Sequence, residues 1–229
     1  MSAPSTAPRP KLIYCAERHP SFDPDGFTRR WRQHARLGMS MARWVNIHRY
    51  VHCDPLALAL PPGVSARTSD GVALLWYRSE AARQRHVADQ DARAIMKRDE
   101  VETFARPVAA FSYMARELVY RPAPGAAATL FLLFTRRADM APDQFAAFRR
   151  DVLATRVQSA IAAGGYIQNF PAPAGLPSGL AVDGIDEISV ADPAGLDLPA
   201  LGAALARAEF ATLSGLWARQ IVLYQADHS

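Results

Sequence analysis

The sequence predicts an α+β protein made of two ferredoxin-like βαββαβ units that pack against each other within one chain. The main observation is an internal repeat, in which Phe27 corresponds to Phe145, 118 residues later. Strand-like and helical segments follow the same order in both copies, and the offset between matching positions falls in small steps to 103 near the C-terminus. Small changes of offset place the length differences in loops. We therefore expect one fold, present twice.

The elements of the first unit follow from residue types. Asp23 and Pro24 are typical of the first positions of a helix, Asp54-Pro55 is typical of a strand end, and Asp70-Gly71 is typical of a turn. Between these signals, β-branched and aromatic runs indicate strands, and apolar residues at helical spacing indicate helices. The expected elements are a strand at 11–17, a helix from Asp23 to near Gly38, strands at 44–53 and 72–77, helical sequence at 79–104 and a strand at 109–120.

The second unit repeats this order. Its first strand is expected at 129–136, a helix starts at Ala141-Pro142, and further strands follow at Gly165 and after Asp183-Gly184. A βαββαβ unit forms four antiparallel strands with both helices on one face of the sheet. The face of the sheet that carries no helices must also be buried, and it can pack against the sheet of the second unit. We expect a flexible tail at 1–10, a first unit at 11–121 that carries the functional site, and a degenerate second unit at 129–229.

The composition excludes several classes of protein. Half of the 229 residues are apolar, which is enough for a sizeable core, yet no apolar run is long enough for a membrane span. Cys15 and Cys53 fall inside predicted strands, where buried and reduced thiols are expected. We expect a cytoplasmic protein with no membrane partner, and a homodimer of pseudo-dimers is an assembly that the sequence allows.

The charge is unevenly shared between the two units. Residues 1–120 carry 18 Lys and Arg against 12 Asp and Glu, whereas residues 121–229 carry 8 against 10. The arginines are scattered without interleaved aromatic residues, so we expect no nucleic-acid partner. A small hydrophobic or aromatic anionic ligand suits the first unit.

Several motifs of the first unit resemble the EthD family of dimeric α+β barrel proteins. These motifs are Lys-Leu-Ile-Tyr-Cys at 11–15, Asp-Pro-Asp-Gly-Phe at 23–27 followed by Trp31 and His34, Arg-Tyr-Val at 49–51, and Asp-Gly-Val-Ala-Leu-Leu-Trp at 70–76. The second unit resembles the family through residues 166–169 and 183–184. The resemblance implies a tandem EthD protein folded as an internal pseudo-dimer. Proteins with this barrel include monooxygenases, cyclases, isomerases, dehydratases and haem peroxidases, so the resemblance leaves the reaction open.

The second strand of the first unit carries most of the candidate site. Alternation along a strand puts Trp44, Asn46, His48, Tyr50 and His52 on one face. This face either lines a cavity with aromatic walls and converging polar groups, which is the usual form of a small-molecule site, or it faces water. Five of the six histidines lie in the first unit, which favours that unit for catalysis.

We assign roles to these residues from their chemistry. An imidazole titrates near neutral pH, so His34 and His48 are the candidate proton carriers, and Tyr50 is the candidate donor to a phenol or enolate. Arginine pairs with a carboxylate through two parallel hydrogen bonds. The predicted substrate-binding residues are Arg43, Trp44, Asn46, Arg49, His52, Trp76 and Tyr113.

Other catalytic signatures are missing from the sequence. It contains no His-Glu-x-x-His motif, no pair of Cys-x-x-Cys motifs and no phosphate-binding glycine loop. We therefore expect no metal and no organic cofactor. The predicted function is a cofactor-independent lyase or isomerase that decarboxylates, dehydrates or cyclises an aromatic or polyketide-like acid by histidine acid/base catalysis. Two alternatives remain: a non-catalytic binding or accessory protein of a catabolic pathway, and a cofactor-free monooxygenase.

Overall fold

The computed structural model describes residues 9–123, 125–172 and 179–226. Most of the N-terminal tail predicted at 1–10 lies outside the described residues. The first half contains β1 (Pro10–Ala16), α1 (Pro24–Met39), the 3-10 helix η1 (Ala42–Asn46), β2 (Ile47–Leu56), β3 (Ser65–Ala66), β4 (Gly71–Tyr77), α2 (Glu80–Ala88), α3 (Gln90–Thr103), the 3-10 helix η2 (Val108–Phe111) and β5 (Ser112–Arg121). The second half contains β6 (Ala128–Arg136), α4 (Pro142–Phe148), the π-helix η3 (Arg149–Leu153), α5 (Ala154–Ala160), β7 (Gly165–Pro171), β8 (Gly184–Val190), α6 (Leu198–Leu205) and β9 (Phe210–Gln225).

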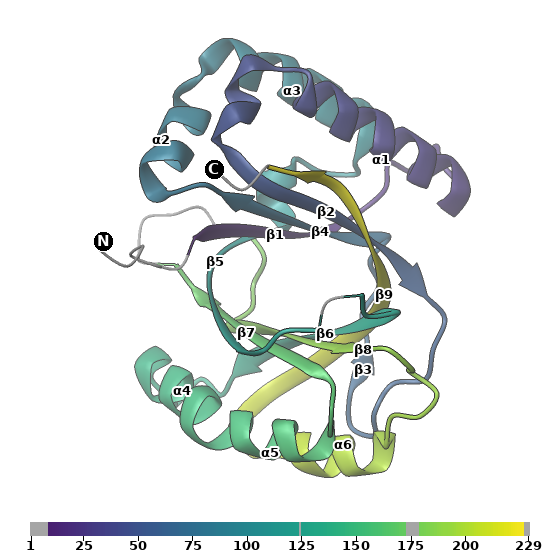
Figure 1. Ribbon diagram of the computed structural model, residues 1–229, viewed down its shortest axis with the longest axis vertical. Helices are drawn as coiled ribbons and strands as arrows, with labels where there is room; N and C mark the ends of the chain where they lie inside the picture. The colour runs from purple at the N-terminus through teal and green to yellow at the C-terminus, as the bar shows by residue number, and fades with distance from the viewer. Residues whose placement is uncertain (1–8, 124, 173–178, 227–229) are drawn as a thin grey trace, which may run out of the picture.

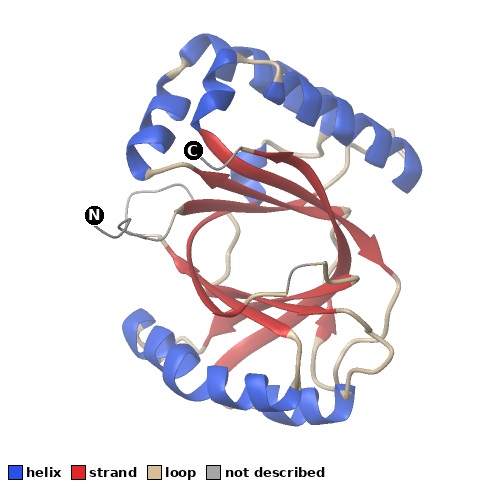
Figure 2. Ribbon diagram, in the orientation of Figure 1, coloured by secondary structure: helices blue, strands red, loops and turns tan. Residues whose placement is uncertain are grey.

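The strands form one closed antiparallel barrel. Their order is β2-β4-β1-β5-β7-β8-β6-β9, and a further pairing of β2 with β9 closes the ring. The short strand β3 pairs in parallel with β9, outside this ring. Helices α1, α2 and α3 cover one side of the barrel, and α4, α5 and α6 cover the opposite side (Figures 1 and 2). The predicted α+β barrel is therefore confirmed. None of the described helices is long and apolar enough to cross a membrane.

Helix α1 begins where the sequence predicts. The Asp23 side chain accepts a hydrogen bond from the backbone N–H of Gly26 and caps the helix, and Pro24 occupies a first-turn position. Phe27 and Trp31 then recur at helical spacing and are fully buried against the strands. The helix ends at Met39, one residue beyond the predicted Gly38.

Four predicted boundaries are wrong. Asp54-Pro55 does not end β2, which continues to Leu56 because these residues still pair with β9. The strand predicted from Trp44 begins at Ile47, because residues 42–46 form η1, in which Asn46 Nδ2 donates to the Arg43 carbonyl. The helical sequence at 79–104 is two helices, because Asp89 caps α3 by accepting from the Ala92 N–H. The strand predicted from Ala109 begins at Ser112, since η2 occupies residues 108–111.

Side chains of the first-half strands are buried on both faces. Ile13, Cys15 and Val51 point into the barrel, whereas Tyr14 and Tyr50 pack under the helices. Lys11 also points into the barrel, where its ammonium group pairs with Glu117 of β5 and Glu187 of β8. Cys15 and Cys53 are buried and free. The barrel is thus a packed core that holds the two helical layers apart.

Candidate functional site

A groove lies on the outer face of the first half, between α2 and α3 and the strand ends below them. Its volume is about 690 Å³, which is within the usual range of small-molecule sites. The floor is apolar and is formed by Leu12 at the start of β1, Met114 at the start of β5, and Met96 of α3. Tyr77, the last residue of β4, lies at the same end of the sheet. The antiparallel pairing brings these strand ends together.

Three cationic side chains of this groove have no carboxylate partner among the described residues: Arg43 of η1, and Arg93 and Lys97 of α3. Arg83 also lines the groove, but it is paired with Glu80 at 2.6 Å. The buried Nε of Arg43 has no hydrogen-bond partner. An excess of unpaired positive charge over an apolar floor suits an organic anion.

Glu100 is the carboxylate that faces these cations. Its Oε2 accepts a hydrogen bond from the backbone N–H of Val108 at 3.2 Å. Burial raises the pKa of the Glu100 carboxyl above its ordinary value, and the Val108 N–H and Lys97 oppose this shift. Burial also raises the pKa of Tyr77 to about 12, so its phenol is a hydrogen-bond donor at neutral pH. A carboxyl with a raised pKa in a cleft is a candidate proton carrier.

The predicted site residues fall into three different places. Arg43 lines the groove. Tyr50 and His52 lie under α1, where the His52 ring stacks on Trp31 with 3.6 Å between the ring centroids. His52 Nε2 is 2.6 Å from the Tyr50 hydroxyl, and its Nδ1 contacts Arg32. Burial, followed by the charge of Arg32, lowers the pKa of His52 well below its ordinary value.

His34 is also enclosed by the helical layer. Its Nδ1 is 2.5 Å from Asp99 Oδ2 of α3, and Arg30 binds the same carboxylate. Burial lowers the pKa of His34, and the hydrogen bond to Asp99 opposes this shift. Neither His34 nor His52 lines the groove. The expectation that the Tyr50 and His52 face lines a cavity or faces water is wrong, because α1 packs over it.

The remaining predicted residues lie around η1 and inside the barrel. Trp44 is packed against Tyr50 and Tyr224, and Asn46 accepts from Arg85 Nε at 3.2 Å. The His48 carbonyl accepts from the Ala226 N–H at 2.8 Å. Three others lie on the barrel side: Arg49 stacks over Trp76, Trp76 Nε1 donates to Glu117 at 3.0 Å, and the Tyr113 hydroxyl is 3.5 Å from the Asn169 carbonyl.

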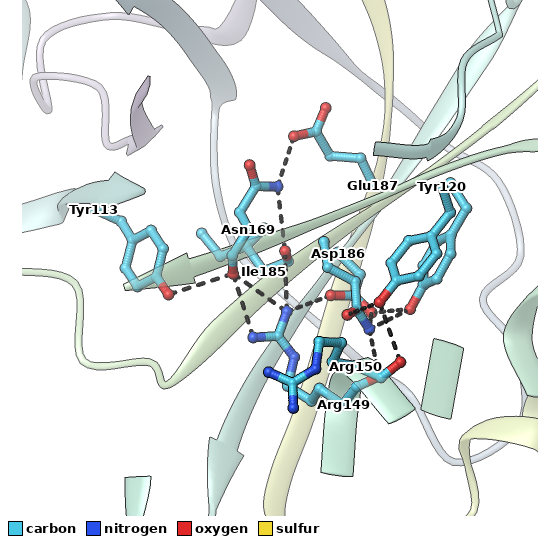
Figure 3. Close-up of polar contacts among 10 residues, drawn as sticks. Tyr113, Tyr120, Arg149, Arg150, Asn169, Ile185, Asp186 and Glu187 are labelled. Atoms are coloured by element: carbon cyan, nitrogen blue, oxygen red, sulfur yellow. Dashed lines mark hydrogen bonds and ion pairs between the residues drawn. The ribbon is translucent and has the colours of Figure 1, made fainter. Parts of the chain in front are cut away.

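The second half contains a different polar cluster at the base of its helical layer (Figure 3). Arg149 and Asp186 are fully buried and form an ion pair. The Tyr166 hydroxyl donates to Asp186 at 2.6 Å, and Gln168 Nε2 donates to the Arg149 carbonyl at 2.9 Å. The two opposite charges neutralise each other, so this cluster holds no excess charge for an anionic ligand.

Sequence reasoning missed Arg93, Lys97 and Glu100. A signal was present, because Gln90, Arg93, Lys97 and Glu100 recur at intervals of three or four residues and therefore share one face of a helix. A charged helix face is usually exposed to solvent and contacts no ligand, so this pattern by itself does not predict a site. Only the position of α3 above the ends of β1, β4 and β5 turns this face into the wall of a groove.

Comparison with known proteins finds a family model that matches part of the first half. The EthD domain model matches residues 19–107. Among curated proteins, none matches the sequence significantly.

Three solved structures share the fold over nearly their whole length. An anthrone oxidase-like protein aligns with a TM-score of 0.60 and 10% identity, over 94% of this chain and 92% of its own. A predicted monooxygenase from Lactobacillus acidophilus NCFM aligns with a TM-score of 0.52 and 10% identity, over 96% of this chain and 97% of its own. A second predicted monooxygenase, from Fusobacterium nucleatum subsp. nucleatum ATCC 25586, aligns with a TM-score of 0.55 and 8% identity, over 98% of this chain and 99% of its own. At this identity the likeness establishes the fold alone.

Proposed function

We propose that this EthD-domain protein is an enzyme that binds an aromatic or polyketide-like organic anion in the groove and moves a proton on it. One observation carries the proposal: three cations without carboxylate partners and one carboxyl of raised pKa surround an apolar floor. Such a combination of apolar surface, a few converging polar groups and a perturbed pKa is typical of active sites.

Most of the groove residues are proposed to bind the substrate, and one is proposed to transfer a proton. The guanidinium groups of Arg43 and Arg93 each offer a two-pronged contact to a carboxylate or an enolate, and Lys97 adds a third positive charge. An aromatic ring fits against Leu12 and Met114, where its burial contributes about 25 cal/mol per Å² of apolar surface.

Glu100 is the proposed general base. Its carboxylate would take a proton from a carbon next to a carbonyl or an aromatic ring, and the groove cations would stabilise the enolate that remains. Such an enolate can expel a β-hydroxyl group, which is dehydration, or attack a second carbonyl, which is ring closure. In decarboxylation the enolate would instead form by loss of CO₂, and protonated Glu100 would then return a proton to the carbon. The enolate also begins cofactor-free oxygen insertion, which agrees with the monooxygenase names of two proteins that share the fold.

The catalytic roles of His34, His48 and Tyr50 remain predictions. Glu100 is preferred because it reaches the groove, whereas His34 and Tyr50 are enclosed by the helical layer. A second candidate function is binding without turnover. The exposure of Arg93 and Lys97 favours it, since an open groove admits water to any reacting centre.

Proton exchange into a carbon acid tests this proposal. The probe is an anthrone that carries a carboxylate group, held without oxygen in D₂O, and the loss of its methylene signal is followed by ¹H NMR. The native protein should accelerate exchange, and Glu100→Gln should reduce that rate by ~10²–10⁴-fold. Lys97→Gln should weaken binding, whereas Arg98→Gln, a neighbouring exposed position of α3 that does not line the groove, is the matched control.

Other outcomes of this experiment would favour a different catalytic residue, a different function or a different site. Unchanged exchange in Glu100→Gln, together with its loss in His34→Ala or His48→Ala, would return the chemistry to the histidines. Tight binding of the probe with no exchange would favour the binding protein. No binding at all, or equal binding by Lys97→Gln and Arg98→Gln, would contradict the assignment of the groove.

We also infer that the two halves are duplicated ferredoxin-like units, with limits near 11–121 and 129–229. The pairing order β2-β4-β1-β5 of the first half matches the order β7-β8-β6-β9 of the second, position by position. A helix follows the first and third main strand of each half. Matching pairing orders and the internal repeat support one ancestral unit.

A further inference from the structure

We propose that the groove and a neighbouring cavity form one elongated binding site, whose ligand is an amphipathic anion longer than a single aromatic ring. The proposal rests on the proposed function and adds a requirement for the shape of the substrate. The neighbouring cavity has a volume of about 310 Å³. Lys97, Glu100 and Pro107 line both cavities, so these three residues stand at the boundary between them.

The two cavities differ in character. The groove carries the unpaired cations Arg43 and Arg93. The smaller cavity is lined by Val101, Phe104 and other apolar residues, and the charge of its Arg106 is paired with Glu17. Besides Arg106, and Lys97 and Glu100 at the boundary, its other polar side chain is His19, whose imidazole is 2.8 Å from Ser21 Oγ. The groove therefore suits the anionic end of a ligand, and the smaller cavity suits an apolar end.

Helix α3 gives the scale of the combined site. Arg93 lines the groove, Val101 lines the smaller cavity, and both belong to α3. A helix rises about 1.5 Å per residue, so these two residues, eight steps apart in the sequence, are separated by about 12 Å along the helix axis. A benzoate is shorter than this, whereas linearly fused rings extend toward the smaller cavity. Glu100, at the boundary, would then face the middle of the ligand rather than one end.

A series of acids of increasing length tests this inference. The probes are benzoate, 2-naphthoate and 2-anthracenecarboxylate, titrated by calorimetry against the native protein and two variants. Val101→Asp adds a charge to the smaller cavity at a side chain that is 69% exposed, so the fold should tolerate it. Ile95→Asp, at a side chain of α3 that is 40% exposed and lines neither cavity, is the matched control.

We expect affinity to rise from one ring to three, and Val101→Asp to weaken the three-ring acid about tenfold while benzoate binds as before. Ile95→Asp should change neither. Equal affinity for all three acids, or an equal effect of both variants, would overturn the elongated site while leaving the groove intact. Failure of Arg93→Gln to weaken any of the acids would instead count against the proposed function.

Discussion

At the scale of single residues, the groove combines cations that lack a carboxylate partner with a cavity, whereas several other cations of the first half are paired. Arg30, Arg32 and Arg18 each hold a carboxylate, as does the buried Lys11. Such pairs fix side chains in place and leave little charge for a ligand. Arg43, Arg93 and Lys97 face a cavity without such a partner, which makes them the available cations for binding an anion.

His86 holds Arg43 in position and makes stability depend on pH. Its Nδ1 lies 3.2 Å from the Arg43 carbonyl, and Arg43 Nη1 is 3.5 Å from the His86 carbonyl. Burial, followed by the charge of Arg43, lowers the pKa of His86 to about 4, against the opposing effects of the Arg43 carbonyl and Asp89. The imidazole is therefore neutral in the folded protein at pH values where it is already protonated in the unfolded chain.

We predict that the free energy of unfolding falls as the pH decreases from about 6.5 to about 4, because the unfolded chain binds a proton that the folded chain excludes. His86 contributes up to about 3 kcal/mol to this fall. The slope should be shallower in His86→Phe than in the native protein, as measured by urea denaturation across this range. His19→Gln, at a surface imidazole, is the control. Identical slopes in all three proteins would contradict the prediction.

At the scale of elements, α1 and α3 show which parts of the structure the sequence predicts and which it does not. The residue patterns of α1 and the strands predicted their positions, since caps and apolar periodicity are local properties. The face of β2 was not predictable, because in this closed barrel both of its faces are buried. Alternate residues of β2 therefore belong to two different cores, one inside the barrel and one under the helices. The alternation does not mark one face as a core and the other as a pocket. The groove depends on how α3 lies over the strand ends, which sequence patterns do not specify.

In the second half, the π-helix η3 occupies the position that the middle of α1 has in the first half. Arg149 stands 118 positions after Trp31, as Phe145 does after Phe27, so a buried cation occupies the place of a buried indole. Its guanidinium binds Asp186 and the Asn169 carbonyl beneath the helices (Figure 3). A buried ion pair is expensive to break, because the remaining charge has no partner.

We predict that Arg149→Met lowers the free energy of unfolding by about 3–5 kcal/mol, since it leaves the Asp186 carboxylate buried without a cation. The double variant Arg149→Met with Asp186→Asn should recover part of this loss, because the amide accepts the hydrogen bond of Tyr166 without a charge. Urea denaturation measures both values. A loss below about 1 kcal/mol in the single variant would show that the pair contributes little.

At the scale of the whole molecule, the two halves share a pairing order and differ in their helices. In the first half, α2 and α3 carry the charged face that walls the groove. The corresponding segment of the second half is the single helix α6, whose eight residues, Leu198–Leu205, contain no charged side chain. The repeat predicted that the two halves share an order of elements, and the residue counts predicted the greater positive charge of the first half. The difference between the helical layers is what confines the groove to that half.

The crystal structure of the protein soaked with 2-naphthoate tests the central claim most directly. We predict that the carboxylate lies within hydrogen-bond distance of at least one of Arg43, Arg93 and Lys97, with the rings against Leu12 and Met114. Density for the acid under α1 beside His34 and His52, or in the barrel interior, would contradict the account. Absence of the acid from the groove at saturating concentration would contradict it equally.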